Sequence, residues 1–172
     1  MELERAIRTR RTHKVFSPEP VAPELLQQLF ELARWAPNHH LTNPWRFRVL
    51  GPSTVERLKV IAENAAPGSA SKLDRAPTLV VASVCTQGDS TQQREDLLAS
   101  AVAAYLVLLA AHGAGLAGYW RTLPLLDSPA GRKVLELDAL ETPIGLLHLG
   151  CPRQDQHVPE RAPVDDFVHY LP

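Results

Sequence analysis

Side chains near the amino terminus could bind an anion. Arg10, Arg11 and Lys14 carry positive charge, and Thr12 adds a hydroxyl group. Guanidinium groups bind phosphate through paired, charge-assisted hydrogen bonds, which a hydroxyl can extend. A second polar segment, Ala36-Pro37-Asn38-His39, follows about one helix later. Together the two segments suit a phosphate ligand that also carries a flat, hydrogen-bonding ring.

Each of these segments also has a simpler interpretation when taken alone. Basic residues at the end of a short helix can be a solvated surface that the helix dipole favours. The turn around Asn38 and His39 can merely join a helix to a strand. A third segment, Trp120-Arg121-Thr122, follows a long apolar stretch. Arg121 is then either a surface residue or an inward charge that needs a partner or an anionic ligand.

Other kinds of site are not predicted. His39 and His40 are adjacent, so their side chains point apart, and no carboxylate or thiol is near them in sequence, which argues against a metal site. The chain has no GxSxG or P-loop motif. Its three glycines Gly113, Gly115 and Gly118 follow the expected long helix instead of opening one, so they are not a dinucleotide-binding fingerprint. No side chain is predicted to be an obligatory catalytic acid or base.

Length, charge and cysteine content limit which class of protein the chain can belong to. The chain has 172 residues, a net charge of -1 and two cysteines. A net charge so close to zero gives no overall attraction to nucleic acid or to a membrane surface. A chain with only two cysteines is expected in a reducing compartment, the cytoplasm. The longest apolar stretch, Leu97 to Ala111, is shorter than the roughly 18 to 20 residues that span a bilayer. We expect it to be a helix buried on nearly all sides.

The pattern of elements predicts a single α+β domain over residues 1–172. Helices and strands interleave without a strict βαβ rhythm, which favours a layered sheet with surrounding helices and a buried central helix. Ser90 and Gln93 have capping-box spacing at the start of that central helix. The tail after Pro152 ends in apolar residues, so we expect it to dock on an apolar surface. Helices are expected over residues 2–9, 24–35, 53–65, 90–111 and 129–136, and strands over 45–50, 78–84, 118–122 and 144–150.

In order and spacing, these segments resemble the nitroreductase family of FMN-dependent NAD(P)H oxidoreductases. The resemblance covers essentially the whole chain, and its later part looks like the small, minimal-type branch of the family. The residues that carry it are Arg10-Arg11-Thr12-x-Lys14-x-Phe16, Ala36-Pro37-Asn38-His39, Asn43-Pro44-Trp45, Trp120-Arg121-Thr122 and Leu149-Gly150-x-Pro152.

The resemblance implies a homodimer with FMN at the subunit interface. The Arg10 segment and the Trp120 segment are then expected to meet a flavin held against the other subunit's His39 turn. Asn43 stands where glutamine is usual, which leaves its contact with the flavin open. The implied cofactor-binding residues are Arg10, Arg11 and Thr12 at the phosphate and ribityl chain, Lys14 at the pyrimidine edge, Trp35, His39 and Asn43 at the ring, and Trp120, Arg121 and Thr122 closing the site.

The same resemblance implies the activity. NAD(P)H would donate a hydride, and a nitroaromatic or quinone-like small molecule would accept it in turn, with ping-pong kinetics. Lys14 and Arg10 would favour the negative charge that reduction places on the flavin. Two alternatives stay open: a family member with specialised chemistry such as reductive dehalogenation, and a non-enzymatic flavin-binding or storage protein.

Overall fold

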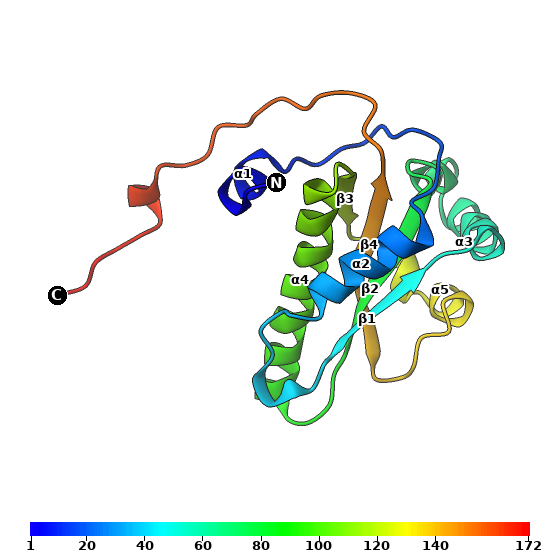
Figure 1. The fold of residues 1–172 in the computed structure, drawn as a ribbon. Coiled ribbons are helices and arrows are strands. Elements are labelled where there is room, and N and C mark those ends of the chain that lie inside the picture. The colour runs from blue at the N-terminus through cyan, green and yellow to red at the C-terminus, as the bar shows by residue number, and fades with distance from the viewer.

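A computed structural model describes every residue, Met1–Pro172, and contains an antiparallel four-stranded sheet between two layers of helices (Figure 1). The strand order is β1-β2-β4-β3. Helices α2 and α4 cover one face, and α3 and α5 cover the other. The predicted α+β layered architecture is therefore confirmed. The helices are α1 (Leu3–Thr9), α2 (Pro23–Ala33), α3 (Pro52–Ala65), α4 (Ser90–Gly113) and α5 (Pro129–Val134), and the strands are β1 (Trp45–Val49), β2 (Thr78–Cys85), β3 (Ala117–Arg121) and β4 (Glu141–Gly150).

The two central strands build two cores. Alternate residues of a strand point to opposite faces, so Val80 and Leu147 pack toward α2 and α4 while Val81 and Leu146 pack toward α3. All four side chains are inaccessible to solvent. The continuous apolar runs of β2 and β4 in the sequence reflect burial on both faces.

Several predicted boundaries differ by two or three residues: α2 ends at Ala33, and β4 begins at Glu141. Two further differences have an identifiable local reason. Helix α5 ends at Val134, two residues early, because Glu136 adopts a left-handed backbone conformation with φ of 53°. The cap of α4 is Asp89 and not Ser90: the Asp89 carboxylate accepts the backbone N–H groups of Thr91 (2.9 Å) and Gln92 (3.0 Å). Asp is as good an N-cap residue as Ser, so the spacing alone could not choose between them.

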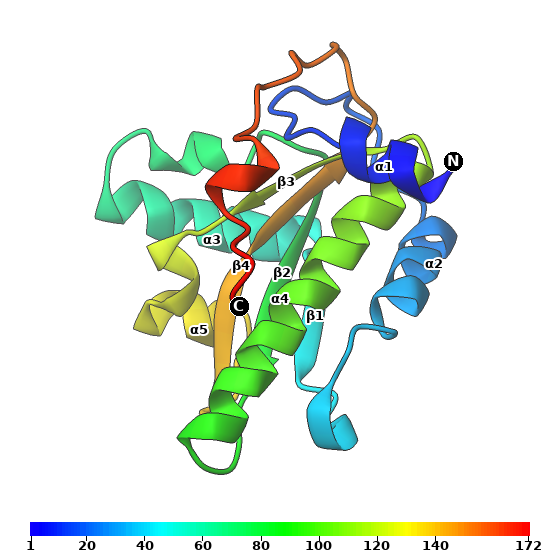
Figure 2. The same cartoon turned by 90° about the vertical axis from the view of Figure 1, so that its left-hand side faces the viewer.

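The expectation that α4 is buried on nearly all sides is also wrong for a single chain. One side packs on α2 and the sheet, but Leu97, Leu98 and Val102 on the other side are 45%, 58% and 38% exposed. Figure 2 shows α4 with little of its own chain in front of it. By length and composition α4 is the one helix that could cross a membrane, a test that core helices of soluble proteins also pass.

The C-terminal segment leaves the body of the fold. After β4 it runs past α1 as an extended arm that includes one short helical turn, η4 (Val164–Asp166) (Figure 1). Phe167 and Tyr170 are 64% and 94% exposed, so the arm does not dock its apolar residues on its own chain. Docking on a partner stays a prediction.

Candidate functional site

The basic segment lies along the free edge of the sheet. Strand β3 is an edge strand, and Thr12 forms a parallel bridge with its Gly118. The backbone N–H of His13 donates to the Gly118 carbonyl at 3.2 Å, and Phe16 pairs with Pro152 just after β4. These backbone contacts hold the residues after α1 in one place, although the segment has no regular secondary structure.

The first three predicted phosphate ligands share one hollow. Arg10, Arg11 and Thr12 line a space of about 200 Å³ whose other wall comes from the C-terminal arm. That wall includes Arg161, for which sequence reasoning had no role, together with Gln156, His157 and Pro159. Its only signal in the sequence was an arginine in a proline-rich tail. The lining contains three guanidinium groups and no carboxylate. Lys14, by contrast, is exposed and does not line this hollow.

The two N-terminal arginines are held in place but are not neutralised. Arg11 donates through one terminal nitrogen to the carbonyls of Arg8 (2.7 Å) and Arg10 (2.8 Å), and its buried Nε has no hydrogen-bond partner. The Arg10 guanidinium lies over the Tyr105 ring, 5.7 Å from its centroid. Neither arginine forms an ion pair with a carboxylate. An anion entering the hollow would find preplaced positive charge.

Burial, with a smaller contribution from the arginine charge, lowers the pKa of two histidines near the Arg10 segment. Burial, and then the neighbouring charge of Arg10, lower the pKa of His112 below 6.5. Burial also lowers the pKa of His13; the Asp155 charge opposes this shift, and that of Arg10 adds to it. His112 is fixed by a 2.8 Å hydrogen bond between its Nε2 and the Thr9 hydroxyl. Burial therefore favours the neutral form of both histidines, and the charge of Arg10 adds to this preference.

These lowered pKa values predict acid sensitivity. Between the lowered values and 6.5 the unfolded chain holds more protons than the folded protein. The free energy of unfolding will therefore rise with pH through this window and level off above about pH 6.5. Urea titrations between about pH 5 and pH 7 measure the slope. A His13→Gln, His112→Gln double variant should reduce the slope, and the buried His148, whose pKa burial also lowers, should supply the remainder. His169→Gln in the exposed tail should leave the slope unchanged; equal slopes in all three proteins would contradict the assignment.

The segment from Trp35 to Asn43 forms a strained, exposed turn after α2. His40, Leu41 and Asn43 have φ values of 57°, 52° and 47°, a left-handed conformation that costs non-glycine residues about 1–3 kcal/mol each. Trp35 and Leu41 are each 76% exposed. Such strain, together with large uncovered side chains, is typical of binding segments.

Hydrogen bonds hold this turn to α4. The Asn38 side chain accepts from the Asn43 backbone N–H at 2.6 Å and donates to the Thr42 hydroxyl at 3.0 Å. Thr42 in turn donates to Asp96 at 2.6 Å. Asp96 is only 1% exposed, so favourable interaction with the helix dipole does not by itself explain a carboxylate at this position. The Asn43 amide donates to the Leu41 carbonyl at 2.8 Å, so it is engaged within the turn.

The third predicted segment ends β3. The Trp120 indole N–H donates to the Ile144 carbonyl at 3.1 Å, and a Cβ at Gly145 would collide with that indole. Arg121 is half-buried without an ion-pair partner. Thr122 is exposed and borders a hollow of about 260 Å³. The other lining residues are Leu123, Pro124, Leu126, Asp127 and residues 143–145.

A single chain leaves the predicted site in separate parts. The Arg10 segment contacts Tyr105 and His112 of α4, whereas the His39 turn is tied to Asp96. At 1.5 Å per residue, Tyr105 and His112 lie about 14 and 24 Å along the helix from Asp96. Trp35, His39 and Asn43 are therefore not brought to the arginines of the same chain.

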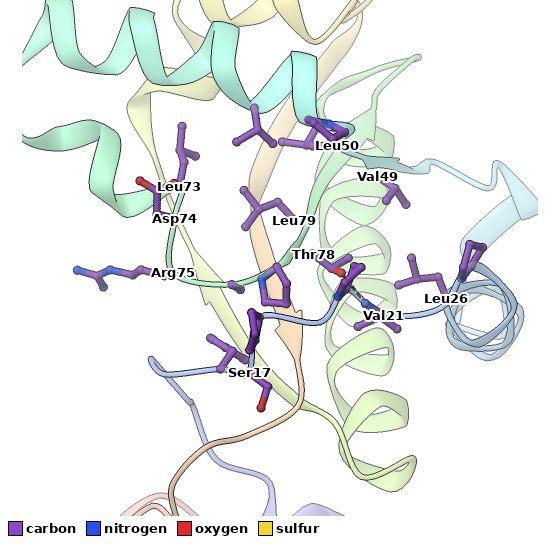
Figure 3. A pocket seen from close by; sticks show the side chains of 18 of the residues that line it. Ser17, Val21, Leu26, Val49, Leu50, Leu73, Asp74, Arg75, Thr78 and Leu79 are labelled. Carbon is purple, nitrogen blue, oxygen red and sulfur yellow. Dashed lines mark hydrogen bonds between the residues drawn. The ribbon is translucent and has the colours of Figure 1, made fainter.

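A larger hollow lies elsewhere in the molecule. It measures about 850 Å³ and lies among the start of α2, the end of β1 and residues 73–79 (Figure 3). Val21, Leu26 and Leu79 give it apolar walls, and the hydroxyl of its Thr78 already accepts the Val21 N–H at 2.9 Å. It contains none of the predicted cofactor-binding residues.

Comparison with known proteins identifies the family. The model of the nitroreductase family matches residues 7–67 and 52–151. The chain belongs to the nitroreductase family. A nitroreductase-family relative, "Putative NAD(P)H nitroreductase YdjA" of Escherichia coli strain K12, is 28% identical over 98% of each chain. Iodotyrosine deiodinase of Danio rerio is 27% identical over 92% of this chain and 63% of its own length.

Solved structures share this nitroreductase fold. The nitroreductase-like family protein of Bacillus cereus superimposes with a TM-score of 0.89 at 23% identity, covering 99% of this chain and 96% of that one. The NADPH:FMN oxidoreductase of Vibrio harveyi, solved in complex with NAD+, gives a TM-score of 0.82 at 20% identity, covering 97% and 76%. At these identities the likeness establishes the fold, and oxidoreductase activity follows in general terms from family membership.

Proposed function

We propose that residues 1–172 form one FMN-binding domain of an oxidoreductase that takes a hydride from NAD(P)H and reduces nitroaromatic or quinone-like acceptors. The observation that carries this proposal is the hollow lined by Arg10, Arg11 and Arg161 with no carboxylate in its wall. The names of the E. coli relative and of the Vibrio harveyi enzyme support the same reaction class.

The residues of the hollow fit the phosphate of FMN. The unpartnered Nε of Arg11, the free guanidinium of Arg161 and the Thr12 hydroxyl are donors suited to a phosphate dianion. When bound, FMN would supply the two-electron redox chemistry between the nicotinamide and the acceptor. The phosphate contacts would fix the position of the cofactor without taking part in that chemistry.

The other predicted residues would orient the ring and exclude water. Trp120 is fixed by its bond to Ile144, and Arg121 beside it is free to meet a polar ligand. Lys14 and Arg10 would add positive charge. No side chain needs to act as an obligatory acid or base, because solvent can supply protons. One open face serving both substrates predicts ping-pong kinetics.

A homodimer would join the separated parts of the site. A two-fold axis perpendicular to α4 would set the α4 helices of the two copies antiparallel, and this arrangement would bring the His39 turn of one copy toward the Arg10 segment of the other. The exposed Leu97, Leu98 and Val102 stripe on α4 would be covered in this arrangement, and the apolar end of the arm would dock on the partner.

The dimer proposal predicts that Leu98→Glu separates the subunits and releases flavin. A carboxylate buried in an apolar interface is costly, so we expect the dimer to weaken by about 100-fold or more. Sedimentation velocity over a range of concentrations measures the mass. Val60→Glu, at an equally exposed site on the opposite face of the sheet, serves as the control. A Leu98→Glu monomer that binds flavin as tightly as the parent protein would rule out the shared site.

The absorbance spectrum of purified protein mixed with FMN tests the proposed function most directly. We expect a bound flavin spectrum that NADH or NADPH bleaches without oxygen and that a nitroaromatic or quinone restores. Protein that stays colourless after exposure to excess FMN would refute the proposal. A bound flavin that neither nicotinamide reduces would indicate storage.

Reductive dehalogenation is the second candidate, favoured by the similarity to iodotyrosine deiodinase. Incubation of the reduced protein with an iodophenol, followed by measurement of free iodide, separates the two reactions. Iodide release faster than nitroaromatic or quinone reduction would favour dehalogenation.

A further inference from the structure

Asp96 lies beneath the His39 turn, and no other buried acidic side chain contacts that turn. The five residues from His39 to Asn43 are all exposed, so they gain little stability from packing. A polar hollow of about 340 Å³ borders Thr42 and Asp96 on the inner side. With three left-handed residues to hold and little packing support, the turn depends on its hydrogen bonds.

Those hydrogen bonds converge on one carboxylate oxygen. Asp96 Oδ1 accepts from the Thr42 hydroxyl (2.6 Å) and from the Gln92 amide (3.0 Å). Gln92 is itself fixed, since its backbone N–H donates to the Asp89 cap. A hydrogen bond to a charged acceptor is roughly twice as strong as a neutral one. The capped first turns of α4 therefore form a rigid base from which Thr42 and Asn38 hold the strained turn.

We propose that Asp96 is a positioning residue, which acts through Thr42 to set the orientation of His39 and Asn43 toward the bound ligand. Asp96 does not touch the ligand itself. The inference rests on the proposed function in one respect only, namely that the ligand held by the turn is a flavin.

Thr42→Val removes the hydroxyl while keeping the shape of the side chain. Without its donor, Asp96 cannot hold the turn, so we expect the dissociation constant of FMN to rise about tenfold or more. The ring resonances of His39 and His40, whose centroids lie 3.9 Å apart in an edge-on contact, should shift in the NMR spectrum. Thr42→Ser retains the hydroxyl and should restore both readouts.

Two matched controls separate positioning from general stability. Thr91→Val makes the same change on an exposed residue in the first turn of α4. The Thr91 hydroxyl forms no hydrogen bond with the His39 turn. Glu95→Gln removes the same charge as Asp96→Asn from the adjacent helix position. Asp96→Asn should weaken FMN binding less than Thr42→Val does, because an amide oxygen can still accept from Thr42. The two controls should leave both the FMN affinity and the histidine resonances unchanged.

FMN affinity and the histidine resonances test the proposed function and the positioning role separately. If the parent protein binds no FMN, the proposed function is wrong, while the histidine resonances of the Thr42 variants still test the positioning role. If Thr42→Val retains both the parent resonances and an FMN affinity within about twofold of the parent's, Asp96 has no positioning role. A lowered thermal midpoint with unchanged resonances and affinity would likewise reduce Asp96 to a structural residue.

Discussion

We expect Arg11→Glu to empty the proposed flavin site. Arg11 lines the hollow proposed to hold the phosphate of FMN, and its Nε is unpartnered; a glutamate there would replace a donor with a charge of the same sign as that phosphate. The loss of a charge-assisted bond costs about 1.5–3 kcal/mol, and repulsion adds to it, so the dissociation constant of FMN should rise by about 100-fold or more. Arg10→Glu should behave in the same way. Gel filtration of the loaded protein, followed by absorbance of the eluted flavin, measures the loss.

Arg5→Glu is the matched control for these variants. It makes the same charge change on an exposed residue of α1 that does not line the hollow. It should retain flavin, since exposed charges at a distance are screened by salt. Stoichiometric flavin in both Arg10→Glu and Arg11→Glu would show that the phosphate is bound elsewhere.

Arg48→Met will destabilise the fold more than any exposed substitution. Arg48 of β1 forms an ion pair with Glu141 of β4, which is 2% exposed and also accepts from the Ser83 hydroxyl. Burial would raise the pKa of Glu141, but the bonds from Arg48 and Ser83 outweigh it and lower the pKa. Without Arg48 a buried carboxylate loses its counter-charge, which costs about 3–5 kcal/mol.

Urea unfolding compares Arg48→Met with Arg46→Met. Arg46 is the exposed neighbour on the same strand, and its side chain donates only to nearby backbone carbonyls. We expect a change within about 0.5 kcal/mol for Arg46→Met. Adding Glu141→Gln to Arg48→Met should recover part of the loss by removing the unpaired charge. Equal midpoints for the two single variants would mean that the ion pair contributes no net stability.

Periodicity in the sequence predicted the secondary structure because it depends on near neighbours. The apolar face of α2 records in its spacing which side of the helix is buried. The continuous valine-rich run that became β2 records burial on both faces of the strand. Predicted helix ends were wrong where a single local feature determines the residue at which the helix begins or ends. Examples are the Asp89 cap and Glu136, whose backbone ends α5 early.

The sequence by itself also determined the chemistry of the basic segment, because Arg10, Arg11 and Thr12 are consecutive and need no fold to share a ligand. Only the tertiary structure decided which distant residues lie beside this segment and beside the other polar side chains. It placed Arg161 of the arm across the hollow, joined Thr42 to Asp96 and set Arg48 against Glu141. It also left the apolar stripe of α4 uncovered in a single chain. The paired residues are 54 to about 150 positions apart in the sequence. Local spacing cannot predict such pairs, because the packing of the chain and the register of the strands determine them.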